Sequence, residues 1–94
     1  MATRDEYVEK MKVQLDTWND DLKDLERKYH EASDETKRKL EPQLAKVREA
    51  RDTAVSKLKA LKDSGEASWD SARDEVEHVW KTLRQSVNYF KSQL

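Results

Sequence analysis

The two histidines, His30 and His78, are the side chains of this sequence best suited to metal binding. Glu75 and His78 stand three residues apart, as in the Glu-x-x-His element of di-iron helical bundles. That site needs two such elements and two further carboxylates, and this chain has one element. Glu26 and His30, four residues apart, could share a surface ion, as many helical pairs can. His78 lies about 200° around a helix from its apolar neighbours at ~100° per residue, so we place it on the surface and assign no metal.

The sequence lacks the residue types that covalent catalysis and phosphate binding need. The chain has no Cys, and no Ser stands in a glycine-rich elbow. Phosphate loops need clustered glycines, and Gly65 is the one glycine of the sequence. The many carboxylates are expected on exposed helix faces, where no burial shifts their pKa toward acid–base work. We therefore expect no enzymatic activity and no cofactor.

A basic cluster in the middle of the chain could contact nucleic-acid phosphates. Its members are Lys37, Arg38, Lys39, Lys46, Arg48 and Arg51. However, residues 1–34 hold 6 Lys/Arg against 10 Asp/Glu, whereas residues 35–63 hold 9 against 5. Because oppositely charged helices attract each other, we interpret the cluster as the face that complements an acidic first helix. We expect no nucleic-acid binding.

Two apolar stripes with alternating spacings of three and four residues predict the helices that position these side chains. The first stripe is Val8, Met11, Leu15, Trp18, Leu22, Leu25 and Tyr29. The second stripe is Leu40, Leu44, Val47, Arg51, Ala54, Leu58 and Leu61. They mirror each other about a point between Asp34 and Glu35, which is the relation that an antiparallel helical hairpin requires. The mirror places Arg51 opposite Trp18, where a cation–π contact could form.

A third segment has its own stripe and the richest aromatic content. This stripe is Trp69, Ala72, Val76, Trp80, Leu83, Val87 and Phe90. Gly65 could end the second helix as a left-handed cap, or it could lie inside a continuous helix at a cost of about 1 kcal/mol. The sequence therefore predicts either an elongated three-helix bundle or a hairpin with one long continuous second helix.

Composition and periodicity together predict an all-α fold. The chain is 35% hydrophobic and 41% charged, and a narrow, sustained stripe in such a sequence is typical of a coiled coil or a long helix. With the mirror relation of the first two stripes, this predicts an antiparallel helical-hairpin coiled coil with a third helical segment. We expect a single helical domain over 1–94, with helix 1 at about 3–32, helix 2 at about 36–63 and helix 3 at about 65–93.

Two local signals concern where these helices begin. Thr3 and Glu6 have the spacing of a capping box, which predicts the start of helix 1. Pro42 costs ~3 kcal/mol inside a helix but little in its first turn. It therefore predicts that regular helix begins near Lys39 to Glu41, or that residues 35–41 form a looser turn with a kink at Pro42.

Several segments resemble a family of small bacterial coiled-coil stress-response proteins. They are Met1-Ala2-Thr3-Arg4-Asp5-Glu6-Tyr7, Lys12-x-x-Leu15-x-x-Trp18-Asn19, Leu61-Lys62-x-Ser64-Gly65-Glu66-Ala67-x-Trp69 and Val79-Trp80-x-x-Leu83. The chain departs from the family pattern at Val79, where a small residue is usual, and at Pro42. The resemblance implies a helical protein induced or needed under stress, and it implies no catalytic residue.

We expect a structural or interaction protein that acts by helix–helix association, as a homodimer or with another helical protein. The chain has neither a basic-then-apolar leader nor an apolar run of ~20 residues, so we expect a cytoplasmic protein with no integral membrane association. Two alternatives remain open. One is a lipid-surface-binding amphipathic module built on residues 65–94, and the other is a monomeric, spectrin-like three-helix spacer.

Overall fold

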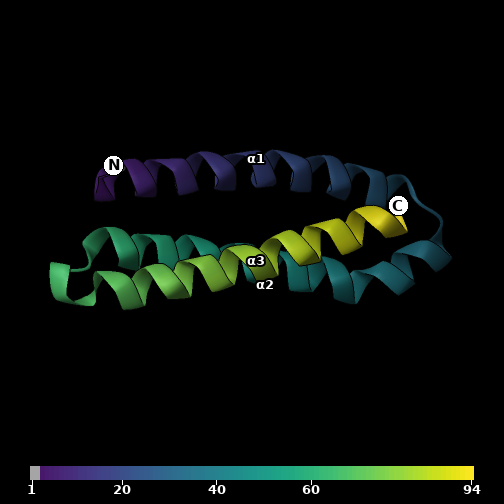
Figure 1. The fold of residues 1–94 in the computed structure, drawn as a ribbon. Coiled ribbons are helices and arrows are strands. Elements are labelled where there is room, and N and C mark those ends of the chain that lie inside the picture. Colours follow the sequence, from purple (N-terminus) through teal and green to yellow (C-terminus); the bar gives the residue numbers. More distant parts are fainter. Residues whose placement is uncertain (1–2) are drawn as a thin grey trace.

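The computed structural model describes residues 3–94, which form three long α-helices. These are α1 (Arg4–Glu31), α2 (Asp34–Asp63) and α3 (Trp69–Gln93), with a short 3₁₀ turn at Glu66–Ser68 before α3. The chain runs up, down and up again, so that α1 and α3 point the same way (Figure 1). The molecule measures 50 × 18 × 17 Å. The all-α prediction is confirmed, and of its two forms the elongated three-helix bundle is the one observed.

The reversal between α1 and α2 takes only two residues, Ala32 and Ser33. The Ala32 amide donates to the carbonyl of Tyr29 and closes α1. The Ser33 hydroxyl accepts from the amide of Thr36 at 3.2 Å and caps the start of α2. This arrangement satisfies amide groups that a helix start leaves free. The predicted antiparallel hairpin is thus formed, with its turn one or two residues earlier than expected.

The expectation that Pro42 delays or kinks helix 2 was wrong, because Pro42 lies within the uninterrupted helix α2. Pro42 cannot donate to the carbonyl of Arg38, but both residues are exposed and water can hydrate that carbonyl. On the inner face Leu40 and Leu44 are each only 4% exposed. Burying two leucines contributes ~3–6 kcal/mol, which offsets a proline cost of ~3 kcal/mol.

Both expectations for Gly65 were also wrong. Its φ of −79° and ψ of 170° are extended, so it is neither a left-handed cap nor part of a continuous helix. Helix α2 ends instead at Asp63 and is capped by Ser64, whose hydroxyl donates to the carbonyl of Leu61 at 2.7 Å. The Ser64 carbonyl accepts from the Arg4 guanidinium at 2.6 Å, which ties this turn to the start of α1.

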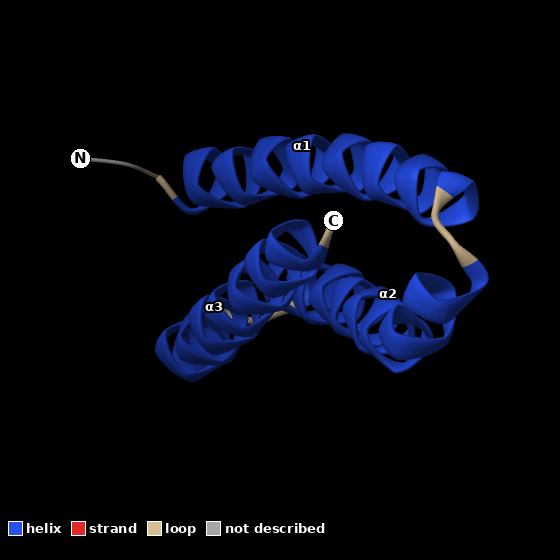
Figure 2. Ribbon diagram, turned by 90° about the vertical axis from the view of Figure 1, so that its right-hand side faces the viewer, coloured by secondary structure: helices blue, strands red, loops and turns tan. Residues whose placement is uncertain are grey.

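The core lies mainly between α2 and α3. Figure 2 shows these two helices close together, with α1 lying across them. Ala54 and Val76 have no exposed surface, and such small side chains let the two backbones approach closely. Fourteen buried apolar side chains form the core, and three of them come from α1: Leu15, Leu22, Leu25, Leu40, Leu44, Val47, Ala54, Leu58, Leu61, Val76, Trp80, Leu83, Val87 and Phe90.

Candidate interaction surface

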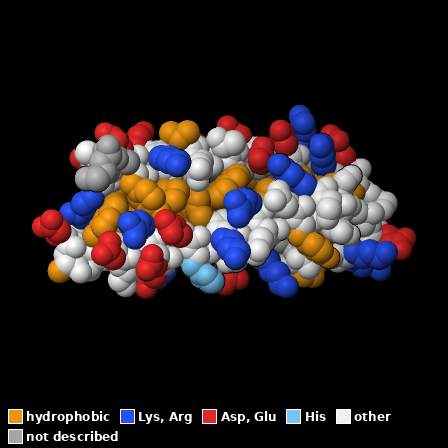
Figure 3. All heavy atoms as spheres, viewed as in Figure 1, with side chains coloured by type: hydrophobic (Ala, Val, Ile, Leu, Met, Phe, Trp, Pro, Cys, Tyr) orange, Lys and Arg blue, Asp and Glu red, His pale blue; other side chains and the backbone are white. Residues whose placement is uncertain are grey.

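A groove between α1 and α3 is where large apolar side chains stay within reach of solvent. Figure 3 shows a band of apolar side chains along the line between these two helices, toward the end where α1 begins. The groove has a volume of about 460 Å³. From α1 it is lined by Met11, Val13, Gln14, Thr17 and Trp18, none of them charged. From α3 it is lined by Glu77, Trp80, Lys81 and Arg84.

Aromatic pairs set the separation of α1 and α3 within the groove and on both sides of it. The pairs, with their ring-centroid distances, are Tyr7–Trp69 at 5.8 Å, Trp18–Trp80 at 6.0 Å and Tyr29–Phe90 at 6.4 Å. Each such pair contributes about 0.5–1.5 kcal/mol beyond its buried area. Large side chains therefore hold α1 on α3 and leave a gap between the helices that small residues would have closed.

Polar contacts bridge the two rims near each end of this groove. The Tyr7 hydroxyl donates to Oε1 of Glu77 at 3.2 Å, and Nζ of Lys91 donates to Oδ2 of Asp21 at 3.2 Å. Burial of the phenol, followed by the negative charge and hydrogen bond of Glu77, raises the pKa of Tyr7 from 10.0 to about 12. The middle of the groove has no such bridge among the described contacts.

On its other side, α1 borders a second groove, toward α2, whose lining is mostly charged. Its charged residues are Asp5, Glu9, Lys12, Asp16, Lys59 and Lys62. Ionised side chains resist the loss of water that binding would require, and charged residues are depleted at the centres of protein interfaces. The groove toward α3 is therefore the better candidate for a binding surface.

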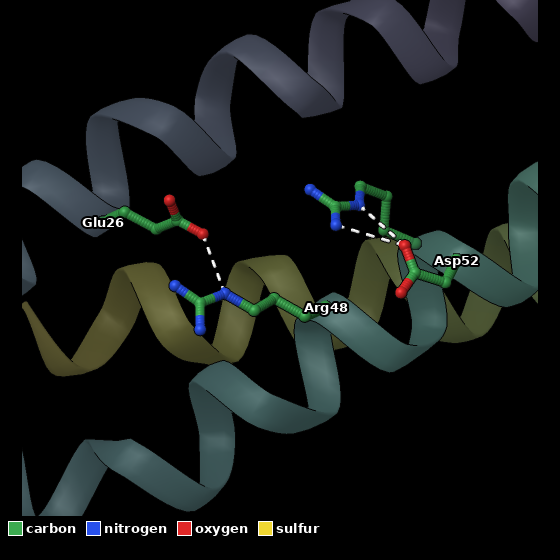
Figure 4. Close-up of polar contacts among 4 residues, drawn as sticks. Glu26, Arg48 and Asp52 are labelled. Carbon is green, nitrogen blue, oxygen red and sulfur yellow. Dashed lines mark hydrogen bonds and ion pairs between the residues drawn. The ribbon is translucent and has the colours of Figure 1, made fainter.

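One ion pair crosses each of the three interhelical seams. Nε of Arg48 on α2 lies 3.0 Å from Oε1 of Glu26 on α1, and Figure 4 shows these two side chains reaching toward each other. The other seams hold Lys57–Glu75 and Lys91–Asp21, each at 3.2 Å. Exposed pairs of this kind contribute only ~0.2–1 kcal/mol each. Their main effect is on which helices pair and in which register.

The expected cation–π contact of Arg51 with Trp18 is not formed. The Arg51 guanidinium instead lies 3.1 Å from the Asp52 carboxylate, and Trp18 packs on Trp80 of α3. Within residues 3–94 the cation–π contact is Arg4 over Trp69, at 4.8 Å. Sequence reasoning missed this contact, because it depends on α3 returning to the start of α1.

Each of the twenty-one residues of the three predicted stripes is buried or half-buried. Fourteen are buried, and seven are half-buried: Val8, Met11, Trp18, Tyr29, Arg51, Trp69 and Ala72. Ala50 and Val79 also pack against the core although they belong to no predicted stripe. Ala50 stands between Val47 and Ala54 at spacings of three and four, so the same periodicity could have identified it.

The histidines lie outside the core. His30 and His78 are both exposed, and Glu75 pairs with Lys57. The described part of the chain contains no group of three or more His, Cys, Asp or Glu side chains that could hold a metal ion. Both histidines considered for metal binding therefore lie at solvent-facing positions of their helices.

None of the helices described in residues 3–94 is long and apolar enough to cross a lipid bilayer. A scan against protein-family models, a search of the curated proteins and a search of the solved structures each found no match to this chain. The features of this protein that bear on its function are therefore its fold and the groove between α1 and α3.

Proposed function

We propose that this chain is a non-enzymatic interaction protein that acts by helix–helix association through the groove between α1 and α3. One observation supports the proposal above all. The α1 rim of this groove is uncharged, and Val13 on that rim is 56% exposed beside the half-buried Trp18. An apolar strip with a polar border is the usual anatomy of a protein–protein interface.

We also propose that the protein is cytoplasmic and bacterial, and that it is associated with stress. Support comes from its resemblance to small coiled-coil stress-response proteins. The segments of that resemblance meet in space: Tyr7 packs on Trp69, and Trp18 packs on Trp80. Met1 and Ala2, at the start of the first segment, lie outside the described residues. In this proposal those segments serve helix packing, and no residue has a catalytic role.

The mass of the particle in solution tests the association. We expect the native protein to be a homodimer at micromolar concentration, with twice the 11.1 kDa of one chain. Val13→Glu should return the mass to that of a single chain, because it brings an ionised carboxylate into the contact. Val13 is too exposed for this change to disturb the core. Sedimentation equilibrium across a concentration series measures both masses.

Val55→Glu is the matched control, since Val55 is 47% exposed and lies beside the charged groove on the other side of α1. It should leave the mass unchanged. A native protein that stays at the mass of one chain would contradict the proposal. So would a Val13→Glu variant that associates as strongly as Val55→Glu.

The same protein can be tested for the two alternative functions. A lipid-surface module on residues 65–94 would have to expose Val87 and Phe90, which the bundle buries. It predicts a blue shift of tryptophan fluorescence and co-sedimentation with anionic vesicles. A monomeric spacer predicts the mass of one chain at all concentrations, and no effect of Val13→Glu on that mass.

A further inference from the structure

Four charged residues of α3 stand seven residues apart and form what we call the charge row. They are Asp70, Glu77, Arg84 and Lys91, so two acidic side chains precede two basic ones. All four are exposed. Residues seven apart lie on the same side of a helix, and this side faces the groove, because Glu77 and Arg84 line it.

The chain itself matches only part of this row. Asp70 pairs with Arg73 of α3 itself at 3.8 Å. Glu77 accepts from Tyr7, and Lys91 pairs with Asp21, both on α1. Between these two partners α1 presents Gln14, which is uncharged, on the stretch of groove that Arg84 lines. Among residues 3–94, Arg84 has no carboxylate within ion-pair distance. The row therefore has charge left to match beyond its own bundle.

A row of two acidic and two basic residues is complementary to a reversed copy of itself. Laid in parallel and in register, two such rows would place like charges together, which is unfavourable. Laid antiparallel about a two-fold axis, every acidic residue meets a basic one, and the symmetry repeats each pair. The centre of the row falls between Trp80 and Lys81, close to the middle of α3.

We propose that a second copy of this chain covers the groove, with the two α3 helices antiparallel and the two-fold axis between Trp80 and Lys81. Glu77 then lies opposite the partner subunit's Arg84, and Asp70 lies opposite the partner subunit's Lys91. This inference rests on the proposed function, and it specifies the partner and the geometry. The apolar side chains that line the groove supply the buried area, while the four exposed ion pairs determine direction and register.

The α1 helices fit the same axis. Tyr7 contacts both Trp69 and Glu77, so it lies level with the residues midway between them. Gln14 follows Tyr7 by seven residues, so it lies level with a point seven residues further along α3, which is the proposed axis. The uncharged rim of α1 would therefore meet its own copy at the centre of the interface, where charged groups are least favourable. The exposed Lys10 and Asp20 lie toward opposite ends of this contact and are complementary when the helices are antiparallel.

Arg84→Glu tests the charge row with little risk to the fold, because Arg84 has no ion pair among residues 3–94. Because the two-fold axis repeats every contact, this one substitution creates two contacts between like charges. We expect the dissociation constant of the dimer to rise at least about tenfold, a change that corresponds to ~1.4 kcal/mol. Glu77→Arg combined with Arg84→Glu reverses both partners and should restore the native dissociation constant. Arg38→Glu, on the exposed face of α2, is the matched control and should change nothing.

Distances between spin labels test the direction of the helices independently. The chain has no Cys, so Ser71→Cys or Lys81→Cys gives one label for each subunit. Both positions are exposed. Labels at position 81 should lie close together across the axis. Labels at position 71 should be separated by ~28 Å along the helices, at 1.5 Å per residue. A parallel dimer would bring the labels at position 71 together as well.

The outcomes separate this inference from the proposed function. If Val13→Glu dissociates the dimer but Arg84→Glu behaves like Arg38→Glu, association through the groove stands and this geometry is overturned. The geometry is also overturned if the double reversal fails to restore the dimer, or if the labels at position 71 lie close together. If the native protein is monomeric throughout, both the geometry and the proposed function are overturned.

Discussion

Tyr7 shows how single side chains fasten α1 to the rest of the bundle. Its ring packs edge-on against Trp69, and its hydroxyl donates to Glu77, so one residue of α1 holds two turns of α3. Ionisation of this phenol would place a second negative charge beside the Glu77 carboxylate. The same contact that stabilises the bundle near neutral pH is therefore a source of instability in strong alkali.

The raised pKa of Tyr7 gives this contact a defined pH dependence. The folded state favours the neutral phenol, so its contribution to the free energy of unfolding is complete below pH 10. That contribution is lost as the pH rises from 10.0, the ordinary value, to about 12, the value in the folded protein. We expect Tyr7→Phe to remove the tyrosinate absorbance step near pH 12. Tyr89→Phe, at an exposed position, should leave that step in place, and a step that persists in Tyr7→Phe would contradict the assignment.

At the level of the helices, the sequence predicts inner faces better than boundaries. A helix that packs on neighbours must repeat its apolar residues every 3.5 positions or so, and for this reason all three stripes lie inward. Boundaries depend on competing local effects. Helix α2 includes Pro42 because the leucines on its inner face outweigh the proline cost, and propensity alone does not reveal this balance. The Arg4–Trp69 contact joins residues distant in sequence, which no local pattern encodes.

The connection between α2 and α3 offers a test at this level. Gly65 has a negative φ, and a methyl group added at its Cα would meet no atom within 4 Å. Gly65→Ala should therefore raise the free energy of unfolding by about 0.4–1 kcal/mol, because alanine restricts the unfolded chain more than glycine does. Urea or thermal unfolding at one fixed protein concentration measures the change. A destabilised variant would mean that this turn needs the conformational freedom of glycine.

At the scale of the whole molecule, the bundle is closed between α2 and α3 and open between α1 and α3. Aromatic side chains hold the open seam apart, and the four charged residues of α3 that stand seven apart follow an order that suits a reversed copy. The apolar content of 35% is low for a chain that must bury a core by itself. A partner that covers the groove would remove further apolar surface from water and so supply the remaining stabilisation.

Small-angle scattering on an absolute scale tests the central claim most directly, since one curve gives both mass and length. Two bundles joined side by side at the middle of α3 should have twice the 11.1 kDa of one chain, and their longest dimension should stay close to the 50 Å of a single bundle. A particle with the mass of one chain would contradict association. A particle with the mass of two chains and about double that length would contradict association through the groove.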